Sequence, residues 1–155
     1  MNKQTTCFFT GHRELPQEKY DEIFQSVCNH IEALYHKGYT DFIAGGAIGF
    51  DTLCSLAVLK LSKTYDINLH IYVPCLGQEK YFSEDQKKQY SDILELAKSV
   101  TVLAPKYTRG CMHTRNRKMA DDSSVCIAYC TKTTGGSAYT VDYAIKKSLE
   151  IIHIS

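Results

Sequence analysis

Short apolar runs alternate along the chain with segments in which apolar residues recur every three or four positions. The runs predict six β-strands, over residues 6–9, 42–44, 69–73, 100–103, 125–129 and 151–154. The periodic segments predict five helices, over residues 16–37, 53–61, 83–97, 112–122 and 140–149. Because nearly all strand residues are apolar, we expect both faces of the sheet to be covered. The alternation therefore predicts an α/β three-layer sandwich, with a mostly parallel sheet and helices on both faces.

Local signals fix several ends of these elements. Pro16 is suited to the first turn of a helix, and Gly38 is suited to its end. The run Ser83-Glu84-Asp85-Gln86 matches a capping box, in which the first and fourth side chains bond each other's backbone amides. We therefore expect a well-defined helix start at residue 83.

Length and charge narrow the class of protein. A chain of 155 residues with 44% hydrophobic residues suits a single domain over residues 1–155. It holds 18 Lys and Arg against 17 Asp and Glu, a formal net charge of +1. This balance disfavours nucleic acid as a partner, because binding to nucleic acid usually needs excess positive charge. No apolar run approaches the roughly 20 residues of a membrane span, and no signal peptide is evident, so we expect no membrane contact and a cytoplasmic location.

The seven cysteines do not form a recognisable metal site. They are scattered along the chain, without a C-x-x-C pair. We expect them to be buried as small apolar side chains, and we expect no bound metal and no required cofactor.

Glycine and arginine residues cluster directly after the predicted strands. Carboxyl ends of parallel strands meet at one edge of the sheet, where ligands bind in such folds. The glycines allow backbone amides to approach an anion, and two clusters precede helix starts that favour phosphate. The clusters, with Arg13, Arg115 and Arg117 as sources of charge, lie at residues 10–13, 45–51, 115–117 and 135–137. The sequence thus predicts an anion-binding crevice at this edge.

Each cluster alone has a simpler explanation. A Gly-Gly pair before a helix is often only turn geometry, and a helical arginine is often a solvated side chain. His12 is a candidate base, ligand contact or capping residue, and Asp51 either complements a helix dipole or holds a ribose hydroxyl. The chain has no complete G-x-G-x-x-G, no Walker A sequence and no G-x-S-x-G. Ordinary dehydrogenases, P-loop enzymes and α/β-hydrolases are therefore disfavoured.

At these motifs the chain resembles the SLOG superfamily, and within it the YpsA-like branch. The resemblance rests on F-T-G-H-R at residues 9–13, G-G-A-x-G-x-D at 45–51, R-N-R-x-M at 115–119 and G-G-S-x-x-T at 135–140. It covers nearly the whole chain, with the motifs in the order of the family. The superfamily includes the DNA-processing protein DprA and the LOG phosphoribohydrolases. It implies a Rossmann-like fold that binds nucleotides or ligands derived from them.

The resemblance to the LOG enzymes is incomplete. Their signature is similar to M-H-x-R-K-x-x-M followed by P-G-G-x-G-T-x-x-E. Residues 112–119 match the first part except at Asn116, whereas Thr134 replaces the proline and Thr140 falls one residue late. Asp142 is the carboxylate nearest the position of the catalytic glutamate, and it is shorter by one methylene. Arg115 and Asp142 are the candidate catalytic pair, and the departures favour binding over hydrolysis.

The resemblance therefore implies a protein that senses or sequesters a nucleotide-derived small molecule, such as an NAD- or ADP-ribose-like ligand. A phosphoribohydrolase-type N-glycosidase acting on a nucleoside monophosphate is the alternative, and an interaction protein with a vestigial pocket is another. The family also implies a homo-oligomer. Compared with DprA, the chain lacks flanking domains and a basic excess, which again disfavours nucleic acid. The expected ligand-binding residues are Gly11, His12, Arg13, Gly45, Gly46, Ala47, Gly49, Asp51, Arg115, Asn116, Met119, Gly135, Gly136, Ser137 and Thr140.

Overall fold

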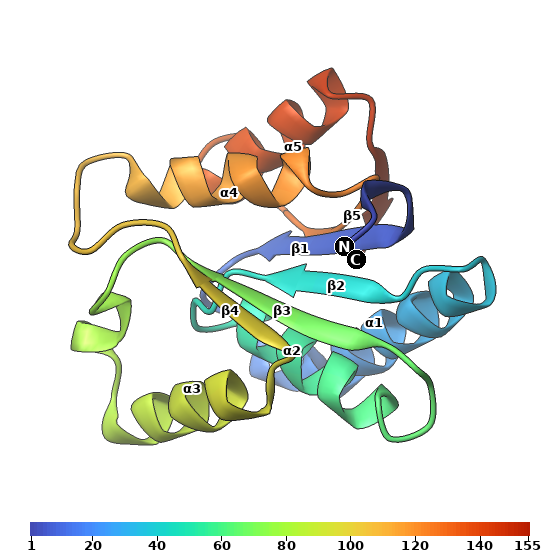
Figure 1. The fold of residues 1–155 in the computed structure, drawn as a ribbon, viewed down its shortest axis with the longest axis horizontal. Helices are drawn as coiled ribbons and strands as arrows, with labels where there is room; N and C mark the ends of the chain where they lie inside the picture. The colour runs from blue at the N-terminus through green and yellow to red at the C-terminus, as the bar shows by residue number, and fades with distance from the viewer.

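Six strands form one parallel sheet in the computed structural model, which describes residues 1–155 (Figure 1). The order across the sheet is β4-β3-β2-β1-β5-β6, and every neighbouring pair is parallel. The strands are β1 Thr6–Gly11, β2 Asp41–Ala44, β3 Asn68–Val73, β4 Ser99–Val102, β5 Val125–Tyr129 and β6 Glu150–His153. From β1 the chain adds β2, β3 and β4 on one side and then crosses to add β5 and β6 on the other. The switch in strand order therefore lies between β1 and β5, and the loops after these strands meet there at the carboxyl edge.

Helices cover both faces of the sheet, so the predicted α/β Rossmann-like sandwich is confirmed. The helices are α1 Tyr20–His36, α2 Phe50–Leu61, α3 Glu84–Leu96, α4 Cys111–Asp121 and α5 Gly136–Lys146. Short 3-10 turns lie at Lys3–Thr5, Gln17–Lys19 and Gln78–Tyr81. In Figure 1, α4 and α5 lie on one side of β1 and β5, and α1 to α3 lie on the other. None of these helices has the length and hydrophobicity that crossing a bilayer would require.

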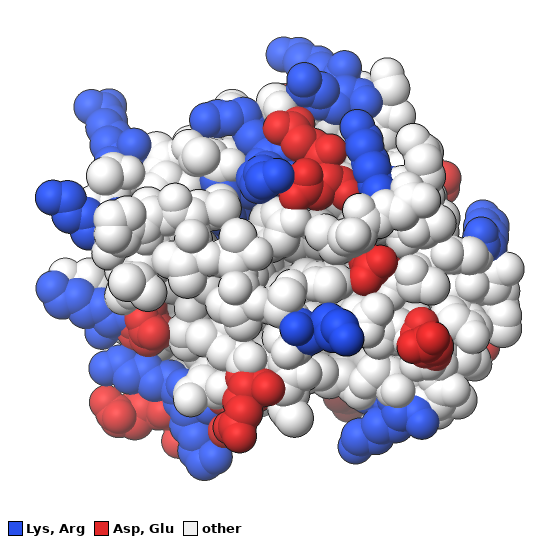
Figure 2. Space-filling model, in the orientation of Figure 1, with Lys and Arg blue, Asp and Glu red and all other residues white.

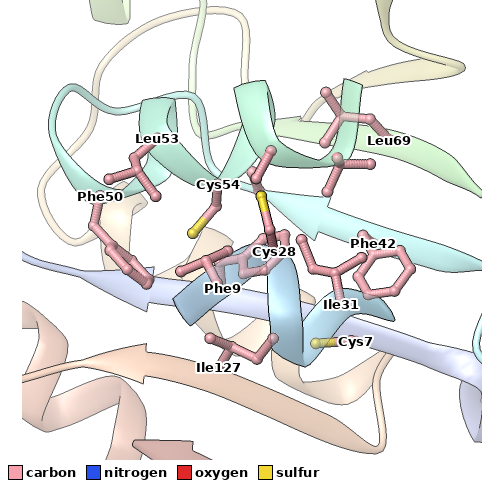
Figure 3. Packing of buried hydrophobic residues seen from close by; sticks show 14 of the residues in the cluster. Cys7, Phe9, Cys28, Ile31, Phe42, Phe50, Leu53, Cys54, Leu69 and Ile127 are labelled. Carbon is pink, nitrogen blue, oxygen red and sulfur yellow. The ribbon is translucent and has the colours of Figure 1, made fainter. Parts of the chain in front are cut away.

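The larger hydrophobic core lies between the sheet and α1 to α3. It contains 23 buried residues, and Figure 3 shows Cys7, Cys28 and Cys54 packed there among phenylalanine and isoleucine side chains. All seven cysteines are free, and every one except Cys130 is buried. Burial raises the pKa of the Cys7 and Cys54 thiols well above the usual value. The expectation that cysteines fill the core as small apolar side chains is confirmed for the six buried ones.

The expected coverage of every strand is wrong at β4. Val100 and Val102 are 40% and 43% exposed, because β4 is an edge strand that neither helical layer covers fully.

The starts of two helices also differ from those that the apolar periodicity predicted. α2 begins at Phe50 and α5 at Gly136, three and four residues before the predicted starts at 53 and 140. The first turn of α5 is Gly136-Ser137-Ala138, whose small side chains give no apolar periodicity. The oligomeric state stays a prediction, which light scattering of the purified chain would test.

The capping box at α3 gives the first testable prediction. The Ser83 Oγ accepts a bond from the Gln86 N–H at 3.2 Å, and the Gln86 Oε1 accepts one from the Ser83 N–H at 2.9 Å. Ser83→Ala removes one of these bonds and should lower the free energy of unfolding by about 1 kcal/mol in urea titrations. Ser91→Ala, the same change at an exposed position inside α3, should leave stability unchanged or raise it slightly. Equal losses in the two variants would contradict the capping role.

Candidate functional site

A cavity of about 280 Å³ opens at the carboxyl edge of the sheet. It lies where the loops after β1 and β5 meet the first turns of α2 and α5 and one face of α4. Its lining residues are Phe9, Thr10, Gly11, His12, Arg13, Ala47, Asp51, Met112, His113, Arg115, Asn116, Met119, Lys132, Thr134, Gly135, Gly136 and Ser137. We call this the first cavity.

The first cavity brings together most of the residues expected from the sequence. Those lining it are Gly11, His12, Arg13, Ala47, Asp51, Arg115, Asn116, Met119, Gly135, Gly136 and Ser137. Gly45, Gly46, Gly49 and Thr140 are not among its lining residues. Asp142 is also absent from the lining, and it is exposed on α5. The structure therefore does not bring Asp142 and Arg115 to the same cavity.

Arg115 forms the floor of the first cavity and is only 4% exposed. Its Nη1 donates to the carbonyl oxygens of Gly45 and of Tyr72, the latter at 3.3 Å, and its Nε donates to Asn116 Oδ1 at 2.8 Å. Nη2 has no oxygen partner and lies 4.0 Å from the Met112 sulfur. Arg115 thus ties α4 to the ends of β2 and β3 and still leaves one guanidinium nitrogen without an oxygen acceptor.

Asp51 is the carboxylate that accompanies Arg115. It is 7% exposed, in the first turn of α2, and it accepts a bond from the Ala47 N–H at 3.3 Å. Burial raises the pKa of Asp51, and the nearby Arg115 charge opposes part of that rise. Burial likewise lowers the pKa of the Arg115 guanidinium, and Asp51 opposes part of that fall. A side chain on Gly45 would collide with both groups, so glycine is needed there for their close approach.

His12 connects the loops after β1 and β5. Its Nε2 accepts a bond from the Thr131 N–H at 2.9 Å, so this nitrogen carries no proton. Burial, followed by the charge of Lys132, lowers the pKa of His12 and favours the neutral ring. The His12 backbone carbonyl accepts a bond from the Phe50 N–H at 3.0 Å. Of the roles left open by the sequence, the geometry gives His12 that of a neutral brace between loops.

Gly49 serves the packing of the same loops. Its φ of +83° lies in the left-handed region, and a side chain there would collide with the backbone of residues 12 and 13. The G-G-A-x-G turn therefore lets the loop after β1 lie directly against the start of α2. This close contact sets one wall of the first cavity, although Gly49 itself does not line it.

The first turn of α5 faces the first cavity with free backbone amides. Gly135 is the N-cap, and no side chain caps the helix. Nothing lies within 4 Å of the position that a side chain on Gly135 or Gly136 would occupy, so this turn is open. Thr140, expected to contact the ligand, instead donates its hydroxyl to the Gly136 carbonyl at 2.9 Å and is 1% exposed. An uncapped helix start of this kind favours an anion.

The charges lining the first cavity are not balanced. Arg13, Arg115 and Lys132 are cationic, whereas Asp51 is the single carboxylate in the lining. Sequence reasoning missed Lys132, although its place in the polar loop after a strand was a usable signal. It also left out Met112 and His113, although both lie in the match to the M-H-x-R signature. The centre of the His113 ring lies 4.3 Å from that of the Tyr139 ring. No group of three or more His, Cys, Asp or Glu side chains is placed to hold a metal ion.

Positive charge also gathers outside the first cavity. Lys80, Lys106 and Arg109 are exposed on the connections that follow β3 and β4. Figure 2 shows lysine and arginine side chains projecting along the left edge, where the strands of Figure 1 end, with acidic groups toward its lower part. The net charge of +1 therefore conceals a basic fringe at the carboxyl edge.

Two solved structures resemble this fold along almost its whole length. DNA processing protein A (DprA) of Streptococcus pneumoniae matches with a TM-score of 0.72 and 16% identity, covering 99% of this chain and 51% of that one. DprA of Helicobacter pylori matches with a TM-score of 0.71 and 15% identity, covering 99% of this chain and 66% of that one. At this identity the likeness concerns the fold.

The net charge led us to expect that nucleic acid is not a partner, and the comparison with DprA shows that this expectation is wrong. The H. pylori protein, described by its single-stranded DNA binding mode, uses this same fold. Net charge was a poor guide because binding depends on the local field, and several basic side chains project along the edge where the strands end.

Sequence comparison identifies the family. The UPF0398 protein BH1768 of Halalkalibacterium halodurans is 29% identical over 121 residues, which span 76% of this chain and 64% of that protein. The chain thus matches less than two thirds of this relative's length. The model of the YspA SLOG family matches residues 8–153, which include every residue that lines the first cavity. The chain belongs to the YspA SLOG family.

Proposed function

We propose that the first cavity binds the phosphate of a nucleotide-derived small molecule, such as an NAD- or ADP-ribose-like ligand, and that the protein senses or sequesters it. The observation that carries this proposal is the unbalanced charge of the cavity: three cations and an uncapped helix start surround a single carboxylate. Phosphate satisfies all of these groups together, because it accepts bonds from backbone amides and guanidinium groups alike.

The cavity also suits the sugar that carries the phosphate. Its volume of about 280 Å³ lies just below the range of roughly 300–1,000 Å³ for pockets that enclose a whole drug-sized ligand. A ribose phosphate fits this size better than a complete dinucleotide. Asp51 is then placed to accept a bond from a ribose hydroxyl near the Arg115 guanidinium.

Single-stranded DNA is the second candidate ligand, favoured by the basic fringe at the carboxyl edge. A strand presents the same sugar–phosphate unit as a small nucleotide, repeated along its length. Lys80, Lys106 and Arg109 lie on the connections beside the cavity, where neighbouring phosphates of a strand would pass. The affinity for a strand would then fall steeply with salt, unlike that for a mononucleotide.

Arg115→Ala should weaken the binding of ADP-ribose about 10- to 100-fold in calorimetry, because a hydrogen bond to a charged group contributes about 1.5–3 kcal/mol. Arg117→Ala is the matched control, since Arg117 lies on the same helix and bonds Tyr139 and Thr114 outside the first cavity. Its affinity should stay within about twofold of the unchanged protein.

Arg115 is buried and also supports the fold, so Arg13→Ala provides a second variant that removes a cation from the lining. Circular dichroism would check that each variant is folded. Folded Arg115→Ala and Arg13→Ala proteins that both keep full affinity would contradict the proposed phosphate site. A protein that binds no phosphate ligand at all would favour the vestigial pocket instead.

The ligand should be recovered intact after incubation with the protein. The resemblance to the LOG enzymes gives Asp142 as the carboxylate for N-glycosidic cleavage, and Asp142 is exposed outside the lining of the first cavity. Chromatography of adenosine monophosphate after incubation should therefore show no free adenine, and Asp142→Asn should leave affinity unchanged. Release of adenine that disappears in Asp142→Asn would establish the phosphoribohydrolase alternative.

A further inference from the structure

A second cavity, of about 520 Å³, adjoins the first. Arg13, Ala47 and Met112 line both, so the two cavities lie side by side with these residues between them. The remaining lining is mostly apolar, with Ile48, Cys75, Gly77, Gln78, Lys80, Tyr81, Phe82 and Tyr107. The second cavity thus begins where the cationic groups of the first end, and it has a different chemistry.

Hydrogen bonds between three loops fix the walls of the second cavity. Gln78 Nε2 donates to the Gly45 carbonyl at 3.3 Å and to the Tyr90 hydroxyl at 3.1 Å, which ties the segment after β3 to the loop after β2. The Leu76 N–H donates to the Ala104 carbonyl at 3.2 Å, which ties it to the connection after β4. Gly45 also accepts the bond from Arg115, so one carbonyl links the walls of both cavities.

Two tyrosines at the second cavity are unusually exposed. Tyr81 is 90% exposed and Tyr107 is 67% exposed, although both line the cavity. They come from different connections, after β3 and after β4. Aromatic rings left open beside a hollow in the surface are typical of binding sites, because their faces remain free for stacking. Lys80 Nζ lies over one face of the Tyr81 ring, 5.4 Å from its centre, where it adds positive charge, so stacking would use the opposite face.

We propose that the second cavity receives the base of the nucleotide whose sugar–phosphate lies in the first cavity. This inference rests on the proposed phosphate site and adds to it the position of the base. The first cavity alone is small for a whole nucleotide, whereas the second offers apolar walls and two open tyrosine rings directly beyond the Arg13 wall. A nucleobase suits these walls because it is planar and stacks on aromatic rings.

The ligand class is therefore a base joined to a sugar–phosphate, either as a free nucleotide or as a unit of a single strand. Lys106 and Arg109 flank Tyr107 on the same connection and are exposed. In a strand, these cations would meet the phosphate of the next unit. A free nucleotide has no further phosphate to place against them, so they distinguish the two sources.

The test compares two probes on three forms of the protein. Calorimetry would measure ribose 5-phosphate and adenosine monophosphate on the unchanged chain, on the double variant Tyr81→Leu/Tyr107→Leu, and on Tyr81→Phe/Tyr107→Phe. The leucine pair should weaken adenosine monophosphate about tenfold or more and leave ribose 5-phosphate within about twofold, since it removes only the rings. The phenylalanine pair keeps both rings and should retain the affinity for adenosine monophosphate within about threefold.

Failure of the two proposals would be distinguishable. If neither probe binds the unchanged chain, the phosphate site itself fails, and with it the base subsite. Suppose that ribose 5-phosphate binds the unchanged chain. If adenosine monophosphate then binds no more tightly, or if the leucine pair leaves the affinity for adenosine monophosphate unchanged, the base subsite is wrong and the phosphate site stands. Both tyrosines are on the surface, so the variants should fold, which circular dichroism would verify.

A short oligodeoxyadenylate identifies the source of the base. If a strand is the ligand, it should bind more tightly than deoxyadenosine monophosphate, and Lys106→Ala/Arg109→Ala should weaken only the oligonucleotide. If a free nucleotide is the ligand, both probes should bind alike and the lysine–arginine pair should not matter. In either case the leucine pair must lower the affinity for both probes. An oligonucleotide whose affinity is unchanged by the leucine pair would overturn the base subsite.

Discussion

The candidate site is organised around one buried guanidinium group, that of Arg115. An arginine removed from water needs hydrogen-bond acceptors and a nearby negative charge, because the cost of desolvating it is otherwise several kcal/mol. Arg115 finds acceptors in the carbonyls of Gly45 and Tyr72 and in Asn116, and Asp51 supplies the charge. Satisfying Arg115 therefore fixes α4 against the ends of β2 and β3 and requires glycine at position 45.

This arrangement places positive charge at the floor of a cavity and leaves part of it unused. The guanidinium is held mainly through Nη1 and Nε, while Nη2 faces only the Met112 sulfur. The open turn at Gly135 and Gly136 adds backbone donors, and neutral His12 holds the neighbouring loops without adding charge. The donors are thus in place before any ligand arrives, which lowers the entropy cost of binding.

The pattern of the sequence predicted the layers and the edge at which the first cavity opens, because periodicity and strand-end position report burial and topology directly. It could not predict how each side chain is used once the loops meet. Thr140 turns back to its own helix, Gly49 serves loop packing, and His113 joins the lining from inside α4. The exposure of Val100 depends on which strand lies at the edge, which no local pattern reveals. Net charge likewise hid the basic fringe, since a sum contains no positions.

We propose that a nucleotide phosphate sits at the open turn of α5, near Arg115. An NMR titration of the isotope-labelled chain with ADP-ribose would test this position by following each backbone amide. We predict saturable shifts of the Gly136 and Ser137 amides and of the Arg115 side-chain signals, with the amides in the middle of α1 unmoved. An unchanged spectrum, or saturable shifts confined to residues outside both cavities, would contradict this account.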